Sequence, residues 1–234
     1  MLVIDPNLHL LPWTTVSGPD INSVPATSYI ARNVPLGYSG HALLVTNYSE
    51  QAGGADLVTC KRPIPQLAGY TLNYLRLRCR MFISSVDMLN LGRLETDTKT
   101  CLIVAPSGQE IQNVVDGSTQ VNPPHWQIDG SPPSWQNTAF EPSIPTDVWF
   151  DYYHDVLINS VTKVFTVLGC GFGDQEYVTK TPDPQNVPWQ TTNWAQLITA
   201  IQLQVMVTNP GTVNVLYDCM DLIWSDTQLK ESFV

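Results

Sequence analysis

Residues 70–84 read YTLNYLRLRCRMFIS, and this stretch decides the fold class. Apolar residues fill the odd positions from 75 to 83, and arginines stand between them at Arg76, Arg78 and Arg80. Side chains of a β-strand point alternately to opposite faces, whereas a helix would mix the two sets. The stretch therefore predicts a strand with one face in a core and three arginines in a row on the other.

Other stretches along the chain show the same two-residue period or are short apolar runs bounded by turn residues. We expect further strands at residues 41–48, 57–61, 100–105, 148–159, 161–170, 176–180, 197–208 and 212–225. The proline-rich residues 106–146 predict long loops with one or two brief strands, and residues 1–36 an N-terminal arm with room for one edge strand. No long amphipathic helix, internal repeat or domain boundary is evident. The expectation is an all-β chain that forms one β-sandwich domain over residues 1–234.

Composition narrows the class of partner. The chain is 43% hydrophobic and 14% charged, which suits a packed core, and its formal charge is −10. A negative field repels phosphate backbones and anionic lipid surfaces, so we expect neither nucleic-acid nor membrane binding. No transmembrane run or signal peptide is visible, and the compartment is left open. Five dispersed cysteines without a CxxC pair predict reduced structural thiols, with one disulfide as an alternative for an exported protein.

Four stretches together resemble one known architecture. They are residues 39–45 (SGHALLV), residues 70–84, residues 149–173, and the closing pair 199–204 (TAIQLQ) with 213–222 (VNVLYDCMDL). Their order is similar to that of the concanavalin A-like jelly rolls of lectins and glucanases, over residues 37–225. The resemblance implies a two-sheet antiparallel jelly-roll sandwich, with galactose-binding-like jelly rolls as the nearest competing fold. A fold of this kind does not by itself establish a function.

The carboxylates do not complete a catalytic centre. Glu95 and Asp97 match the start of the E-x-D-x-E pattern that the resemblance to glucanases implies, but Lys99 replaces the third acid, and a retaining hydrolase needs a facing pair. We interpret residues 95–97 as a solvated turn. The glycines of the Gly169-x-Gly171-x-Gly173 pattern, with no following helix or Lys-Ser/Thr, indicate a hairpin turn rather than a phosphate site.

Metal chemistry finds little support either. In a strand, Asp151 and Asp155 face one way and His154 the other, so the three cannot converge on one ion. Asp218 and Asp221 have opposite parity and no DxDxDG loop, which leaves calcium as a weak alternative. The sequence therefore predicts no catalytic residue, no metal ligand and no cofactor.

The best candidate site combines aromatic rings with planar hydrogen-bonding groups, the two features that bind the faces and the hydroxyls of sugars. If their outward faces lie on one concave sheet, the predicted ligand-binding residues are Arg76, Arg78, Arg80, Trp126, Trp135, Gln202 and Gln204. Tryptophan is more often a core or loop-pinning residue, and the arginines can equally meet acids on neighbouring strands.

The leading hypothesis is a noncatalytic carbohydrate-binding domain with a glycan partner, which uses a concave sheet face and an aromatic rim. One alternative is a structural or assembly domain of a virion or surface protein. Another is a divergent glycoside hydrolase or polysaccharide lyase. The ligand and the oligomeric state stay open.

Overall fold

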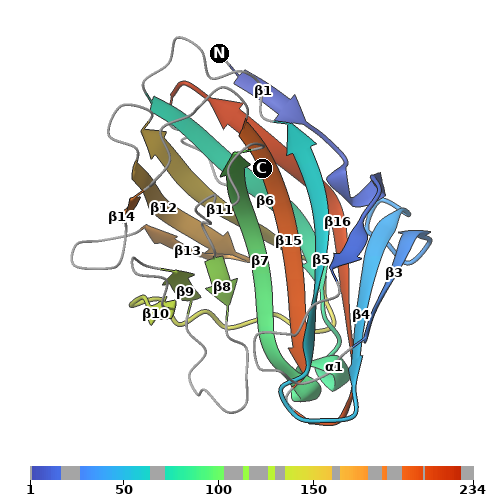
Figure 1. Ribbon diagram of the computed structural model, residues 1–234. Helices are drawn as coiled ribbons and strands as arrows, with labels where there is room; N and C mark the ends of the chain where they lie inside the picture. Colours follow the sequence, from blue (N-terminus) through green and yellow to red (C-terminus); the bar gives the residue numbers. More distant parts are fainter. Residues whose placement is uncertain are drawn as a thin grey trace.

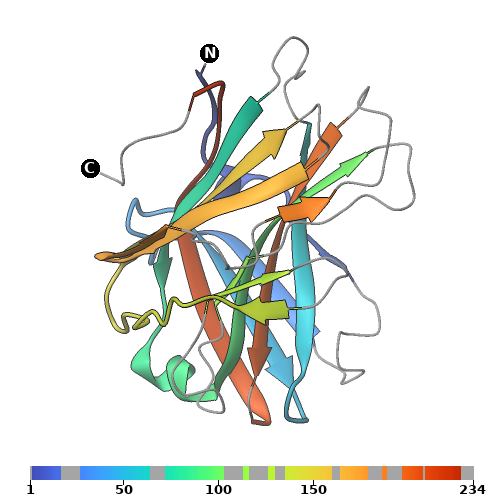
Figure 2. The same ribbon diagram turned by 90° about the vertical axis from the view of Figure 1, so that its left-hand side faces the viewer.

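The computed structural model describes residues 2–16, 27–63, 72–102, 113–115, 126–129, 135–159, 164–178, 186–188, 197–207 and 209–227. These residues form two antiparallel sheets that lie over one another, as Figures 1 and 2 show. Two short helical segments accompany them, η1 (Leu8–Leu10) and α1 (Ser85–Asn90). None of the described helices is long and apolar enough to cross a bilayer.

The larger sheet, sheet A, has nine strands. Its main order is β13 (Gln175–Val178), β12 (Val164–Phe172), β11 (Phe150–Asn159), β6 (Leu72–Phe82), β16 (Gly211–Ser225), β4 (Ala42–Ser49) and β3 (Thr27–Val34). Two short strands lie off this path: β1 (Leu2–Asp5) pairs with β16, and β14 (Asn186–Pro188) pairs with β12.

Sheet B has seven strands and lies over sheet A. Its order is β10 (Trp135–Asn137), β9 (Trp126–Asp129), β8 (Asn113–Val115), β7 (Leu91–Leu102), β15 (Leu197–Val207), β5 (Ala55–Pro63) and β2 (Thr14–Val16). The predicted turn at residues 95–97 is wrong, because β7 runs through these residues and pairs with β15 along its whole length. Residues 95–100 of β7 are polar at both odd and even positions, so the sequence shows no alternation that would have predicted a strand there.

The core lies between the two sheets and explains the alternation in the sequence. Leu75, Leu77 and Cys79 of β6 are almost completely buried, as are Leu203 and Val205 of β15. Burial of one such side chain contributes about 2 kcal/mol. The predicted division of β6 and β15 into inward and outward faces is confirmed for these residues.

A buried polar side chain also joins the sheets. The amide of Asn47 on β4 donates to the carbonyls of Gly54, at 3.0 Å, and of Val205, at 2.7 Å. An unsatisfied amide here would cost free energy. The bond to Val205 holds β4 of sheet A against β15 of sheet B, and the bond to Gly54 holds β4 against the turn before β5.

The N-terminal arm is more regular than the sequence suggested. Its described residues form β1 beside β16, β2 beside β5 and β3 beside β4, so three strands replace the single edge strand expected. Figure 1 shows this arm in blue, passing from one sheet to the other. Proline-rich segments give weak local strand signals, and the open edges of the sheets supply the missing pairing partners.

Candidate functional site on the outer face of sheet A

The outer face of sheet A, turned away from the core, carries the three arginines of β6. Arg76 forms two parallel bonds to Asp155 of β11: its Nε and Nη2 atoms each lie 2.6 Å from a carboxylate oxygen. The two side chains are only 7% and 16% exposed. Burial raises the pKa of Asp155 above its usual value, although the guanidinium of Arg76 opposes that rise.

The other two arginines are paired as well. Arg78 lies 2.8 Å from Asp221 of β16, and Arg80 lies 2.8 Å from Asp151 of β11. We call these three pairs, Arg76–Asp155, Arg78–Asp221 and Arg80–Asp151, the ion-pair ladder. Each of these three arginines already pairs with an acid of a neighbouring strand. The predicted arginine row therefore mainly links strands of sheet A to one another.

A β-bulge brings Asp218 and Asp221 to the same side of β16. Asp218 is opposite Arg80 and Asp221 is opposite Arg78, so two residues of β16 between them face a single residue of β6. Cys219 sits in the bulge with φ 47°, a left-handed conformation uncommon for a residue with a side chain. The prediction of opposite faces, made from strict alternation, is therefore wrong.

Beyond the ladder, β12 has no side chain on its outer side at Gly169 and Gly171, which we call the bare strip. Gly169 is opposite Asp155 and Gly171 is opposite Tyr153, so β12 presents hydrogen atoms where its neighbours present side chains. The ring of Tyr153 lies on Gly171, and a Cβ atom at Gly171 would overlap that ring. Gly173 has φ 64° and begins the two-residue turn into β13. The glycines thus serve partly in a strand, and the interpretation of all three as a turn was wrong.

A pocket of about 260 Å³ opens at the turn end of this bare strip. We call it the acidic pocket; it is lined by Asp151, Tyr153, Gly171, Gly173, Asp174, Gln175 and Glu176. The hydroxyl of Tyr153 donates to Glu176, and burial together with this bond raises the pKa of Tyr153. Arg76 stacks on the Tyr153 ring, 4.3 Å from its centroid, so the ring is held in one place.

The pocket wall is also fixed from the other side. The side-chain amide of Gln175 accepts from the backbone N–H of Ser143 at 2.9 Å and donates to the carbonyl of the same residue at 2.8 Å. The backbone N–H of Gly173 donates to the carbonyl of Asp151 at 2.8 Å. These bonds hold the β12–β13 turn against β11 and against the segment that precedes it.

An aromatic cluster lies next to the pocket, on the same face. It consists of Tyr38, Phe82 and Trp149, with ring centroids 6.5 Å apart for Tyr38 and Trp149 and 5.6 Å for Phe82 and Trp149. The guanidinium of Arg80 lies 3.7 Å from the Tyr38 ring centroid, and Tyr38 is 59% exposed. Because Asp151 lines the pocket and pairs with Arg80, the Arg80–Asp151 pair joins the cluster to the pocket.

The structure separates the residues of the predicted site. The arginines belong to β6 in sheet A, whereas Gln202 and Gln204 belong to β15 in sheet B, so the single sheet face on which they were expected to meet is not formed. Trp126 of β9 is fully buried in the core, and we leave it out of the candidate site. Trp135 lies on β10, and its side chain and those of both glutamines are outside what the structure describes.

The parity argument at residues 151–155 is confirmed. Asp151 and Asp155 face outward to their arginines, and His154 is fully buried, 3.1 Å from the hydroxyl of Tyr152. Burial lowers the pKa of His154 to about 3. Among the residues that the structure describes, no group of three or more potential metal ligands comes together.

The aromatic cluster and the acidic pocket could partly have been found from the sequence. Glycines two residues apart inside an apolar stretch indicate a strand with one bare face, and Trp149 lies at the parity of Asp151. Tyr38 gave no such signal, because its place over Arg80 depends on how the chain returns to the sheet.

Solved structures of lectins have the same fold. Lectin I of Ulex europaeus, solved with the methyl glycoside of α-L-fucose, has a TM-score of 0.51 at 8% identity, covering 96% of this chain and 98% of its own. The winged bean acidic lectin, solved with methyl-α-D-galactose, has a TM-score of 0.50 at 12% identity and the same coverage. Carbohydrate-binding modules of the β-sandwich superfamily also match, with a TM-score of 0.41 at 12% identity, and this chain spans 56% of the length of that chain.

No protein-family model and no curated protein matches the sequence. The expected jelly roll of the concanavalin A-like type is confirmed by the lectin structures and by the strand content of the chain.

Proposed function

We propose that this chain, a jelly-roll domain of the concanavalin A-like type, binds carbohydrate without catalysis on the outer face of sheet A. One observation carries the proposal: an exposed aromatic cluster and a pocket lined by carboxylates meet at the Arg80–Asp151 pair. Sugars need both features, since their C–H faces stack on rings and their hydroxyls donate to carboxylates.

The size and charge of the pocket favour one neutral sugar ring. Its volume of about 260 Å³ lies just below the roughly 300–1,000 Å³ of pockets for drug-sized ligands, so a smaller ligand suits it. Asp151, Asp174 and Glu176 line it, and an acidic sugar would be repelled by these carboxylates. The lectins of the same fold were solved with neutral methyl glycosides, which is a reason to begin the search with such sugars.

Rigidity supports the same conclusion. Tyr153 is held by Gly171, Arg76 and Glu176, and the turn beside the pocket is held by Gln175. A preformed site loses less conformational entropy on binding, which matters for small ligands that offer few contacts.

A glycan array with matched variants tests the proposal. Tyr38→Ala should weaken binding about fivefold to thirtyfold, since loss of a stacking ring costs about 1–2 kcal/mol. Tyr29→Ala is the control, because Tyr29 of β3 is 61% exposed and lies outside the cluster. Asp174→Asn should weaken binding several-fold, with Glu50→Gln as the control for one lost charge on an exposed turn.

Two results would contradict the proposal. One is that no glycan binds at millimolar concentration. The other is that Tyr29→Ala weakens binding as much as Tyr38→Ala. Trp135→Ala belongs in the same set: a large loss with this variant and none with Tyr38→Ala would move the site to sheet B, where β10 carries Trp135.

A further inference from the structure

Asp218 is a buried carboxylate that holds the loop before β4. Its oxygens accept from the backbone N–H of Ser39 at 2.7 Å and from the Ser39 hydroxyl at 2.8 and 3.0 Å. The backbone N–H of Cys219 donates to it at 2.6 Å. Burial alone would raise the pKa of Asp218, but these bonds, together with His9, lower it below its usual value.

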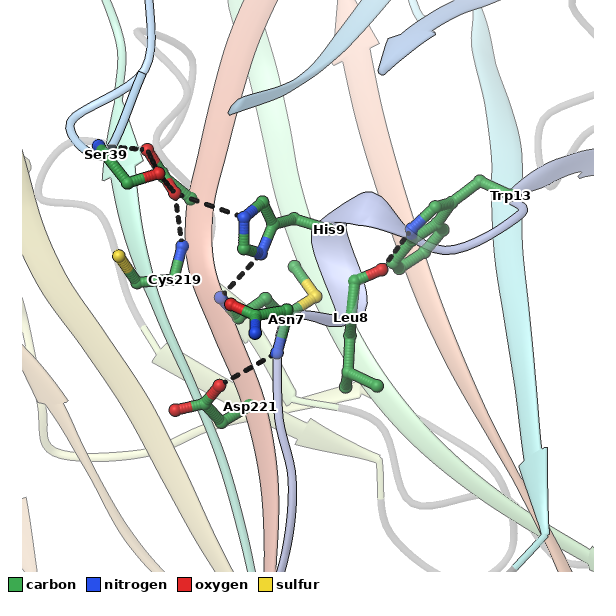
Figure 3. Close-up of polar contacts among 9 residues, drawn as sticks. Asn7, Leu8, His9, Trp13, Ser39, Cys219 and Asp221 are labelled. Atoms are coloured by element: carbon green, nitrogen blue, oxygen red, sulfur yellow. Dashed lines mark hydrogen bonds and ion pairs between the residues drawn. The ribbon is translucent and has the colours of Figure 1, made fainter. Parts of the chain in front are cut away.

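The N-terminal arm supplies the remaining donor, as Figure 3 shows. Nε2 of His9 lies 3.2 Å from Asp218, and Nδ1 of the same ring accepts from the backbone N–H of Met220 at 3.1 Å. Since Nδ1 accepts, Nε2 carries the proton and donates to the carboxylate. The backbone N–H of Asn7 also donates to Asp221, at 3.1 Å, so the arm is bonded to both acids of the bulge.

The loop that Asp218 holds is tight and carries Tyr38. A Cβ atom at Gly37 would lie 2.6 Å from the Asp218 carboxylate and 2.5 Å from the backbone nitrogen of Ala42. Gly40 has φ 89°, and its N–H donates to the carbonyl of Gly37 at 3.0 Å. The loop can therefore approach Asp218 closely only with glycine at these positions.

We propose that Asp218 and His9 are positioning residues for the carbohydrate site: the arm fixes Asp218, Asp218 fixes Ser39, and Ser39 fixes the adjoining Tyr38 over Arg80. The inference rests on the proposed function, in which Tyr38 stacks on the sugar. It assigns a role in binding to the arm, although neither His9 nor Asp218 belongs to the aromatic cluster or lines the acidic pocket.

The arrangement explains why a carboxylate is buried at the bulge. Four donor groups converge on its two oxygens, which a neutral amide could not accept without turning its own N–H₂ toward a donor. The other titratable groups that act on His9 are Asp221, which favours the charged ring, and His41, which opposes it. Burial has the largest effect and lowers the pKa of His9, so the ring stays neutral near pH 7 and keeps Nδ1 free to accept.

Amide hydrogen exchange of residues 37–41 tests the anchoring without any ligand. Ser39→Ala removes the hydroxyl donor, and His9→Ala removes the arm contact; both should raise exchange at Ser39 and Gly40 several-fold. Ser39→Thr keeps a hydroxyl, so the amides of this loop should stay as protected from exchange as in the unaltered protein. Leu10→Ala, at an exposed residue of the same turn as His9, and Thr212→Ala, at an exposed residue of β16, should leave exchange unchanged.

The same variants on the glycan array test the link to binding. Ser39→Ala and His9→Ala should weaken binding about threefold to tenfold, and Ser39→Thr should bind like the unaltered protein. Unchanged exchange in Ser39→Ala and His9→Ala would overturn the anchoring, and raised exchange with unchanged binding would overturn the positioning role. If the unaltered protein binds no glycan, the proposed function fails, and the exchange measurement still decides whether the arm holds the loop.

Discussion

The two halves of the outer face of sheet A differ in how their charged side chains are placed. On β16, β6 and β11, each arginine meets a carboxylate of the next strand, so the ion-pair ladder satisfies itself. On β12 and β13, glycines remove side chains, and Asp174 and Glu176 remain exposed around an open pocket. The comparison teaches that a conspicuous charged row can be structural, whereas the binding site that we propose lies where side chains are missing.

This difference follows from desolvation. An arginine pair with little exposure has exchanged water for its partner, and a ligand would have to break that bond before forming its own. The exposed carboxylates of the pocket keep free acceptor positions, which a sugar hydroxyl can fill at little cost. Stability and binding should therefore respond to different residues on the same face.

Among the substitutions, the largest expected effect on stability is in the ladder. Arg76→Leu leaves Asp155 buried without its partner and should lower the free energy of unfolding by about 3 kcal/mol. Arg78→Leu should cost about 1 kcal/mol, because Arg78 is 35% exposed and water replaces part of the lost bond. Urea unfolding measures both, and equal costs would contradict the comparison. The double variant Arg76→Leu with Asp155→Leu should recover much of the loss.

Acid should destabilise the chain through the opposite, inward side of β11. His154 has a pKa of about 3 when folded and about 6.5 when unfolded, so the unfolded chain binds more protons between these values. The contribution of neutral His154 to the free energy of unfolding is therefore fully present above about pH 6.5. As the pH is lowered from there to about pH 3, the free energy of unfolding decreases by at most about 1.4 kcal/mol per pH unit. Unfolding measured from pH 7 to pH 4 should show this slope, and His154→Gln should flatten it.

Filling the bare strip should have a smaller effect on stability. Gly171→Ala places a methyl group where the Tyr153 ring lies and should cost about 1–3 kcal/mol, as overpacking does. The displaced ring should also weaken sugar binding. In the Tyr153→Ala background the same substitution should cost much less, because the overlap is gone; an unchanged cost would show that the ring is not the cause.

The smallest effect on stability is expected inside the pocket. Asp174 is exposed and lies in a turn, so Asp174→Asn should change the free energy of unfolding by less than about 0.5 kcal/mol while weakening sugar binding several-fold. Thermal unfolding and the glycan array measure the two quantities on one sample. A large loss of stability would show that Asp174 has a structural role, as the ladder residues do, and would contradict the prediction.

Much of the fold was accessible from the sequence, because alternation is a local property. The faces of β6 and β15 follow from residues 75–83 and 203–207, and the inward position of His154 follows in the same way. Alternation cannot say which strands are neighbours. For that reason the partners of the arginines could not be chosen, and Gln202 and Gln204 were grouped with arginines that belong to the other sheet.

The candidate site was harder to predict than the fold. It depends on the bare strip of β12, whose glycines look like turn residues when only the sequence is read. It also depends on Tyr38, which reaches Arg80 only because the loop before β4 folds onto the sheet. The burial of Trp126 shows the converse: a tryptophan among loop-forming residues became part of the core. These outcomes depend on contacts between distant parts of the chain.

The extra residue at Cys219 divides β16 into two half-strands of opposite phase. Before it, the odd-numbered Val213, Val215 and Tyr217 face the core; after it, the even-numbered Leu222 and Trp224 do. If β16 instead alternated strictly through this position, with every residue kept, the first phase would continue to the end of the strand. An acid would then enter the apolar interior, and a tryptophan would be turned out into water.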